Sequence, residues 1–226
     1  MKAGRRELKY YISYNDYRVL SGILQEVIGR DPHGARNKGY LIRSLYFDDI
    51  DDKAFFEKMY GTDNRKKFRL RLYDLNSKRV KFEIKSKFND TILKETALVT
   101  KKDAIAIQNK DYEVLLKYKN DVLNKVYYSF KTNYYHPVVM IDYTRDAFFF
   151  EYNDVRVTFD QRLMSNSTNM DIFDDDAFML PLLKEGVLIM EIKYNQFIPD
   201  WIKKLLQIQR FERCAISKYC ISRLAQ

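Results

Sequence analysis

Charged side chains occupy every second position in two neighbouring stretches of this chain. Lys67–Tyr73 alternates charged with apolar residues, and Lys81–Lys87 repeats the pattern. Period two is typical of a β-strand, and Asn76-Ser77 between the stretches suits a turn, so we predict an antiparallel hairpin. The cations of the hairpin then share one face. Because guanidinium groups bind phosphate oxygens through paired hydrogen bonds, such a face could bind a chain of phosphates.

Other predicted strands carry similar charged faces. Together these faces hold ten cations: Arg5, Lys9, Lys67, Arg69, Arg71, Lys81, Lys85, Lys87, Arg156 and Lys193. They also hold four carboxylates: Glu7, Glu83, Asp160 and Glu191. In the usual interpretation, an antiparallel sheet turns such a face to solvent and its apolar face to the core.

Some of these charged residues could also have a purely structural role. Lys67, Lys81 and Arg5 lie near strand ends, where side chains are commonly solvated. Asp160 could buttress Arg156 or Arg162, and Arg43 could pair with Asp48.

A second interpretation places the charged faces inside a closed barrel and covers the apolar faces with helices. Like charges opposite one another across a strand pair repel, and a bound polyanion would relieve that repulsion. About eight strands close a barrel wide enough for one small or linear ligand.

Composition narrows the class of protein. Hydrophobic residues make up 46% of the 226 residues and the net charge is +9, which excludes a disordered chain and points to a polyanionic partner. Cys214 and Cys220 lack zinc-site spacing, and two histidines do not indicate a Ser-His-Asp site. No signal peptide or transmembrane stretch is visible, so we expect a cytoplasmic protein. Nucleic acid is disfavoured as a partner because the strand faces lack aromatic platforms for stacking bases.

The order of the predicted elements indicates an α+β fold with an antiparallel sheet, in a single domain spanning residues 1–226. The predicted strands are Arg5–Ile12, Lys67–Tyr73, Lys81–Lys87, Thr91–Val99, Val138–Thr144, Ala147–Tyr152, Val155–Asp160 and Val187–Tyr194. An apolar run, Tyr40–Phe47, ends at Asp48-Asp49. The predicted helices follow Ser13 or Asn15, span Asp51–Tyr60, run with breaks from Thr100 towards Tyr135, and follow Pro199.

Eight short motifs occur along nearly the whole chain in an order that resembles the VTC domain. They are Glu7-x-Lys9-Tyr10, Ile42–Asp48, Arg69-x-Arg71-x-Tyr73, Glu83-x-Lys85-x-Lys87, Asp142-Tyr143-x-Arg145-x-Ala147-Phe148, Arg156–Asp160, Glu191–Tyr194 and Ser217-Lys218-Tyr219. The VTC domain is the polyphosphate polymerase domain of the vacuolar transporter chaperone, within the triphosphate tunnel metalloenzymes. The resemblance implies an antiparallel, closed β-tunnel of about eight strands with helices packed outside.

The resemblance also implies an activity, which is transfer of the γ-phosphoryl group of ATP to a growing inorganic polyphosphate chain, with Mn²⁺ or Mg²⁺ as cofactor. The terminal phosphate of the chain is the nucleophile, so catalysis needs mainly positioning and charge neutralisation. Two alternatives stay open: a tunnel triphosphatase that hydrolyses tripolyphosphate or nucleoside triphosphates, and a non-catalytic polyanion-binding module. Export of a product across a membrane would require a separate membrane partner.

By resemblance, the site residues fall into three groups. The catalytic group is Arg69, Arg71, Lys85, Arg145 and Lys218. The phosphate-binding or substrate-binding group is Lys9, Lys87, Lys94, Tyr143, Arg156, Lys193 and Ser217. The metal ligand is Glu191, and the second-rank candidates Glu7 and Glu83 could equally be salt-bridge partners of the lysines. Arg145 shares the strand face of Tyr143 rather than that of Asp142, so either a bulge re-aims it or this face is the tunnel wall.

Overall fold

The computed structural model describes residues 6–31, 39–89 and 91–225. Arg5, where the first strand was predicted to begin, lies outside the described residues. The chain divides into two compact units, each described here by itself. The first unit comprises Met1–Leu41, Tyr143–Leu163 and Leu183–Ser217, and the second comprises Ile42–Asp142, Met164–Leu182 and Lys218–Gln226.

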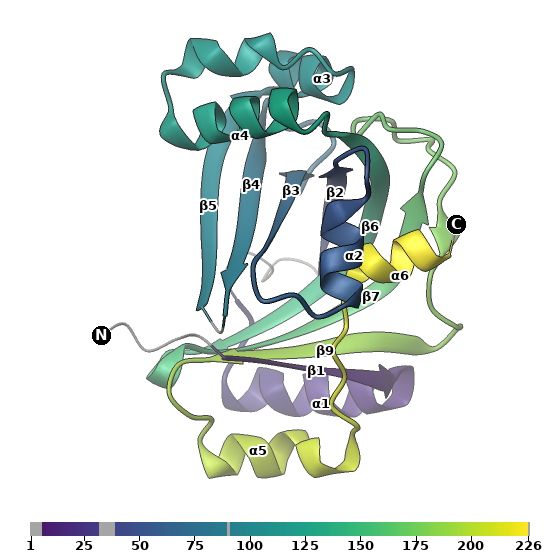
Figure 1. The fold of residues 1–226 in the computed structure, drawn as a ribbon. Coiled ribbons are helices and arrows are strands. Elements are labelled where there is room, and N and C mark those ends of the chain that lie inside the picture. Colours follow the sequence, from purple (N-terminus) through teal and green to yellow (C-terminus); the bar gives the residue numbers. More distant parts are fainter. Residues whose placement is uncertain (1–5, 32–38, 90, 226) are drawn as a thin grey trace. The chain divides into compact units, whose positions relative to one another are not determined.

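The first unit pairs strands that are far apart in the sequence. Strand β1 (Arg6–Ser13) pairs antiparallel with β9 (Val187–Tyr194), which pairs in turn with β7 (Val155–Asn166). Their apolar side chains, among them Tyr10, Phe159 and Met190, pack with residues of α1 (Tyr14–Val27) and α5 (Asp200–Leu206). Figure 1 shows α1 and α5 together on one side of β1 and β9. The charged residues of these strands therefore lie on the face that these two helices leave uncovered.

The start of α1 is fixed locally by its sequence. The Ser13 hydroxyl accepts the backbone N–H of Asp16, and the Asp16 carboxylate accepts the backbone N–H of Ser13. This reciprocal capping box satisfies two backbone donors that no helical carbonyl can reach. Of the two predicted caps, Ser13 is the one that the helix uses.

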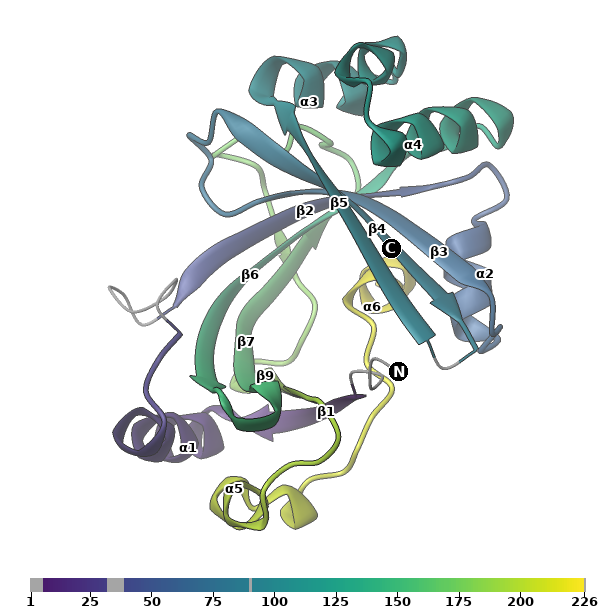
Figure 2. The ribbon, with the colours of Figure 1, turned by 90° about the vertical axis from the view of Figure 1, so that its left-hand side faces the viewer.

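The second unit is built from neighbouring strands along the chain. Strands β2 (Tyr40–Asp48), β3 (Arg65–Leu72), β4 (Arg79–Phe88) and β5 (Thr91–Thr100) pair antiparallel in sequence order. Their apolar residues pack with α3 (Lys101–Gln108), the 3₁₀ helix η1 (Glu113–Tyr118) and α4 (Asp121–Thr132). Figure 2 shows α3 and α4 lying together against β4 and β5. Two short helices, α2 (Lys53–Met59) and α6 (Lys218–Leu224), pack against each other.

The strands follow the order β1-β9-β7-β6-β2-β3-β4-β5, where β6 is His136–Phe150, and the short β8 (Leu180–Pro181) pairs with β7. An α+β fold with an antiparallel sheet is therefore confirmed, with nine strands rather than eight. In the described part of the chain no pairing joins β1 to β5, the two ends of this order. Closure of the sheet into a barrel is not confirmed, and the division 1–226 as a single domain stays a prediction. The chain is completed by the 3₁₀ helices η2 (Tyr152–Asp154) and η3 (Ile208–Arg210).

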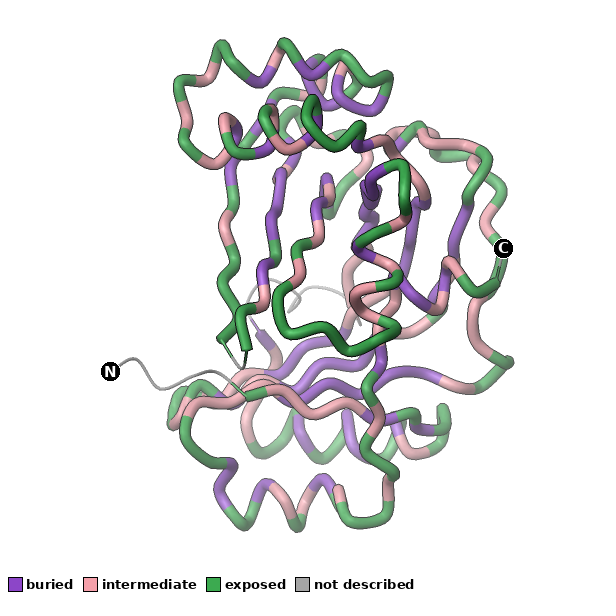
Figure 3. The backbone as a smooth tube through the Cα atoms, viewed as in Figure 1, coloured by how far each residue is buried: buried purple, intermediate pink, exposed green. Residues whose placement is uncertain are grey.

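Burial follows the strands. Figure 3 shows buried residues concentrated on the strands, whereas exposed and buried residues alternate along the helices. No helix in the described ranges is long and apolar enough to cross a membrane.

One prediction about the strands was wrong. Val138–Thr144 and Ala147–Tyr152 were expected to be separate strands, but both belong to the continuous strand β6. Arg145 and Asp146 interrupt the apolar run, and each has a charged partner. Arg145 pairs with Asp160, while Asp146 pairs with Arg30 and accepts a hydrogen bond from Tyr17. Because both polar side chains are satisfied, the strand continues through them.

A buried ion pair anchors the second unit. The Arg43 guanidinium binds both oxygens of Asp142, with Nε–Oδ1 2.9 Å and Nη2–Oδ2 2.8 Å, and it also donates to the backbone carbonyl of Asp174. Arg43 is 4% exposed and Asp142 is 8% exposed. The expected partner Asp48 is instead used at α2, where it accepts the N–H groups of Ala54 and Phe55. Arg43 therefore ties β2 to β6 and to the segment after β7.

Arg43→Ala should destabilise the protein by about 3–5 kcal/mol, because it leaves a buried carboxylate without its partner. Burial raises the pKa of Asp142 and Arg43 opposes this shift, so the carboxyl should have a higher pKa in the variant than in wild type. Protonation then stabilises the folded variant first, and its deficit should shrink as the pH falls through the pKa of the variant. Denaturant unfolding at several pH values measures this effect. Lys131→Ala, which removes the exposed partner of Glu113, is the control and should change little. An Arg43→Ala deficit that grows at lower pH would contradict the assignment.

Candidate functional site

The second unit carries a strongly cationic sheet face. Residues paired across antiparallel strands lie on the same side of a sheet, and the pairs Lys67–Lys85, Arg69–Glu83 and Lys85–Lys94 fix this side. The cations that share it are Arg65, Lys67, Arg69, Arg71, Arg79, Lys81, Lys85, Lys87 and Lys94. On strands β3, β4 and β5 only one carboxylate, that of Glu83, shares it. We call this side the cationic face; the apolar residues between its members form the core on the other side.

Glu83 is the centre of the cationic face. Its carboxylate lies 2.6 Å from Arg69 Nη2, 2.6 Å from Lys94 Nζ and 3.8 Å from Arg71 Nη1, and the residue is 1% exposed. Burial alone would raise the pKa of Glu83, but Arg69, Arg71 and Lys94 together lower it to about 2. The carboxylate is therefore ionised at neutral pH and positions three cations. Because it offsets only one of their charges, the group keeps a net positive charge.

Side chains of β2 also hold the two arginines. Arg71 Nε donates to the Ser44 hydroxyl at 3.0 Å, and Arg69 Nη1 donates to the Tyr46 hydroxyl at 2.8 Å. Burial would raise the pKa of the Tyr46 phenol, yet the charges of Arg69 and Arg71 lower it to about 8. Both guanidinium planes are thus fixed by protein neighbours, and such preorganised donors favour anion binding.

Helix α6 meets the cationic face through Tyr219. The Tyr219 ring stacks on Tyr46 with centroids 5.3 Å apart, and Lys67 Nζ lies 4.7 Å from the Tyr219 centroid. Burial lowers the pKa of Lys67 to about 8, so the expectation of a solvated Lys67 was wrong. Arg223 fixes the helix to Asp52 through two hydrogen bonds of 2.7 and 2.8 Å. Lys218, predicted to act in catalysis, is the first residue of this helix.

The remaining predicted residues of the second unit lie on the same face. Lys85 and Lys87 follow Glu83 along β4, and Lys87 Nζ lies 3.7 Å from the Asp63 carboxylate. Sequence analysis missed Ser44 and Tyr46, although both lie in the quoted motif Ile42–Asp48. They alternate with apolar residues along that motif, and this alternation was the available signal.

The first unit carries a second charged face, on which the described cations contact carboxylates. Lys9 pairs in register with Glu191, and Glu7 with Lys193. Lys9 Nζ lies 2.6 Å from Glu7 and donates to the carbonyl of Ile216 at 3.1 Å, while Lys193 contacts Glu191. Burial would lower the pKa of Lys9, but Glu191 and Glu7 raise it, so the ammonium stays charged.

Arg145 belongs to this second charged face. Its guanidinium binds both oxygens of Asp160 at 2.6 and 2.7 Å, and Nη2 lies 3.9 Å from Glu191. The Tyr143 ring lies under the guanidinium, 5.3 Å from its central carbon. The strand face shared by Arg145 and Tyr143 is therefore the charged one, and Asp160 buttresses Arg145 rather than Arg156 or Arg162.

Arg156 has a different partner, which sequence analysis did not identify. Its Nη2 lies 2.7 Å from the Asp31 carboxylate and 3.4 Å from the Tyr40 hydroxyl. Ser217 closes the first unit in sequence, directly before α6. Four cations of this unit, Lys9, Arg145, Arg156 and Lys193, thus meet four carboxylates, Glu7, Asp31, Asp160 and Glu191.

The two faces differ in what they can bind. The cationic face suits an anion with several phosphate groups, because its arginines and lysines outnumber its carboxylate. No group of three or more His, Cys, Asp or Glu side chains in the described ranges is arranged to hold a metal ion. A divalent ion could therefore fit at Glu191 only in the mode in which one or two carboxylates act with phosphate oxygens of a ligand.

Comparison with solved structures shows the fold. A Hippeastrum protein described as a candidate adenylyl cyclase with a dominant triphosphatase activity has 13% identity and a TM-score of 0.57, covering 98% of this chain and 97% of that chain. Candidate adenylate cyclases from Vibrio parahaemolyticus and Bacillus halodurans have 12% and 13% identity and TM-scores of 0.53 and 0.52. The first covers 99% of both chains and the second 95% of both chains.

No curated protein matches the chain in sequence. The VTC domain family, in contrast, matches residues 4–225, which is nearly the whole length. The match includes every motif from Glu7 to Tyr219 on which the resemblance rested. The chain therefore belongs to the VTC domain family.

Proposed function

We propose that the protein is a polyphosphate polymerase that transfers the γ-phosphoryl group of ATP to the end of an inorganic polyphosphate chain. The observation that carries the proposal is the cationic face, where one buried carboxylate holds Arg69, Arg71 and Lys94 in place. Guanidinium groups fixed in this way can each bind two phosphate oxygens. Lys85 and Lys87 extend the row along β4 and would contact further phosphates of a linear substrate.

In this reaction the protein would mainly hold the reacting phosphates in position. A terminal oxygen of the polyphosphate chain forms a bond to the γ-phosphorus of ATP, and the bond from that phosphorus to the bridging β,γ-oxygen breaks, so ADP leaves with the electron pair. The attacking oxygen is already anionic, so no proton has to be removed. Arg69, Arg71, Lys85 and Lys218 of the second unit are the proposed catalytic cations, which hold the phosphates in line and offset their charge. Arg145, on the charged face of the first unit, is proposed as a further catalytic cation.

Hydrolysis is the alternative, and the Hippeastrum protein described with triphosphatase activity keeps it open. A hydrolase benefits from a base that activates water. On the cationic face, the Glu83 carboxylate has its pKa lowered to about 2 by Arg69, Arg71 and Lys94, although burial opposes this shift. A carboxylate with so low a pKa is a weak base. Glu83 is therefore poorly suited to activate a water molecule itself.

A divalent ion, Mn²⁺ or Mg²⁺, belongs to the proposal as well. Glu191 would hold it, with Glu7 as the second-rank carboxylate, and Lys9, Arg156, Lys193, Tyr143 and Ser217 would bind phosphates or substrate around them. When bound, the ion would neutralise negative charge on phosphate oxygens. Glu83, with three cations around it, is better suited to position them than to bind a metal.

Binding tests the role of the cationic face. Arg71→Ala should weaken tripolyphosphate binding by about one to two decades, since a charge-assisted hydrogen bond contributes about 1.5–3 kcal/mol. Arg71→Lys should recover only part of the affinity, because an ammonium group cannot form the two parallel hydrogen bonds of a planar guanidinium group. Calorimetric titration at one salt concentration measures both effects. Arg18→Ala on the exposed side of α1 removes the same charge and is the control. If Arg71→Ala and Arg18→Ala lose the same affinity for tripolyphosphate, only the net charge of the protein matters and the specific role of Arg71 is rejected.

Product analysis tests the reaction. Incubation with ATP and Mn²⁺ should yield long polyphosphate chains and ADP. Glu191→Gln removes the proposed metal ligand but keeps the size of the side chain, so turnover should fall at least about a hundredfold while tripolyphosphate still binds. Glu185→Gln, at an exposed residue before β9, should retain full activity. Free phosphate as the sole product would establish the hydrolase instead, and full activity in Glu191→Gln would remove Glu191 from the site.

A further inference from the structure

The second unit contains a cavity on the sheet side opposite the cationic face. Lys66 and Phe68 line it, and both alternate along β3 with Lys67 and Arg69 of the cationic face. The cavity has a volume of about 220 Å³ and is bounded by α2, β3, the end of β4 and the end of α4. Arg65, at the start of β3, is the one lining residue that the cavity shares with the cationic face.

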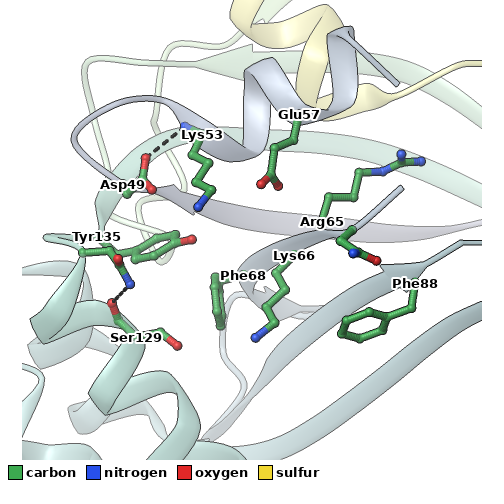
Figure 4. A pocket seen from close by; sticks show the side chains of 11 residues that line it. Asp49, Lys53, Glu57, Arg65, Lys66, Phe68, Phe88, Ser129 and Tyr135 are labelled. Atoms are coloured by element: carbon green, nitrogen blue, oxygen red, sulfur yellow. Dashed lines mark hydrogen bonds between the residues drawn. The ribbon is translucent and has the colours of Figure 1, made fainter. Parts of the chain in front are cut away.

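A buried phenol without a partner points into this cavity. Tyr135 is 9% exposed, and its ring lies 5.0 Å from that of Phe130 and 4.9 Å from that of Phe68. The Tyr135 hydroxyl makes no hydrogen bond to any residue that the structure describes, and Figure 4 shows it directed into the open space. Burial raises the pKa of Tyr135, and nearby Asp49 raises it further, so the hydroxyl remains a hydrogen-bond donor. The hydroxyl oxygen itself is open to the cavity, so it can donate a hydrogen bond to a molecule bound there.

Charges of both signs surround the same space. Lys53 and Glu57 project into it from α2, and Lys66 reaches it from β3 (Figure 4). In the described part of the chain none of these three side chains forms a hydrogen bond or an ion pair. Asp49 adds a second carboxylate, of which one oxygen already accepts the N–H groups of Asp51 and Lys53. Arg65 is a third cation in the lining. A simple anion would meet the two carboxylates, and a simple cation would meet the three cationic side chains.

The walls between these charged groups are aromatic. Phe68 is buried in the floor of the cavity, and Phe88 is 49% exposed at its rim. An apolar group of a ligand would gain burial here, since Phe88 otherwise leaves much of its ring in water.

We propose that this cavity binds a small zwitterion of the amino-acid type with an apolar side chain. The carboxylate of the ligand faces Lys53, Lys66 and the Tyr135 hydroxyl. Its ammonium group faces Glu57, and its side chain lies against Phe68 and Phe88. The site does not depend on the proposed transfer reaction, because the residues assigned to the ligand are not members of the cationic face and the ligand carries no phosphate.

Ligand-observed NMR or calorimetry with the whole chain tests the proposal. L-Phenylalanine is the first probe, and saturation is expected by about 10 mM. Two analogues each lack one charge: phenethylamine has no carboxylate, and 3-phenylpropionate has no ammonium group. Each should bind at least about tenfold more weakly than L-phenylalanine, because each leaves one set of charged side chains without its partner.

Conservative substitutions in the cavity test whether L-phenylalanine binds there. Tyr135→Phe and Glu57→Gln should each weaken L-phenylalanine binding at least about tenfold. Tyr128→Phe on the exposed side of α4 and Glu185→Gln are the matched controls and should bind as wild type. Melting temperatures of all variants check that the fold is intact. Failure of L-phenylalanine to bind, equal binding of either analogue, tighter binding of inorganic phosphate, or full affinity in Tyr135→Phe would each overturn the proposal.

Discussion

Glu83 lies almost fully buried between Arg69, Arg71 and Lys94, and the cationic face of the second unit depends on this contact. Two unit charges 4 Å apart interact by about 4 kcal/mol at the effective dielectric typical of a protein surface. Without the carboxylate, three neighbouring cations would therefore repel one another strongly. With it, the cations stay in place and still carry a positive excess. A site with such an excess is stable when empty and gains further from a bound polyanion.

Charged and apolar residues alternate along these strands, so the pattern that places the charges on one face also places the apolar residues in the core. Between Lys67 and Arg71 on β3 lie Phe68 and Leu70, which pack with residues of α3 and α4 on the other side of the sheet. A slip of one residue in the register would move the cations into that core and the apolar residues out of it. The hydrophobic effect thus fixes the register, and the register fixes which cations meet Glu83. In the first unit, β1 and β9 place Lys9 beside Glu191 for the same reason.

Much of this arrangement could be predicted from local sequence. The period-two pattern predicted the strands, the turn at Asn76-Ser77 predicted the hairpin, and together they placed Arg69 and Glu83 on one face.

Contacts between residues far apart in sequence could not be derived in this way. Tyr219 lies about 150 positions beyond Lys67, and no local pattern indicates that its ring would cover the lysine. The continuous β6 was missed because Arg145 and Asp146 are polar, and their partners Asp160 and Arg30 come from other elements. The motifs carried the family assignment, since their order does not depend on knowing these contacts.

A structure of the protein with bound tripolyphosphate would test the central claim most directly. If the cationic face is the substrate site, phosphate oxygens should lie within hydrogen-bond distance of the Arg69 and Arg71 guanidinium groups, and Glu83 should keep its contacts with them. Bound phosphates at another surface, with Arg69 and Arg71 contacting only Glu83, Ser44 and Tyr46, would contradict the account.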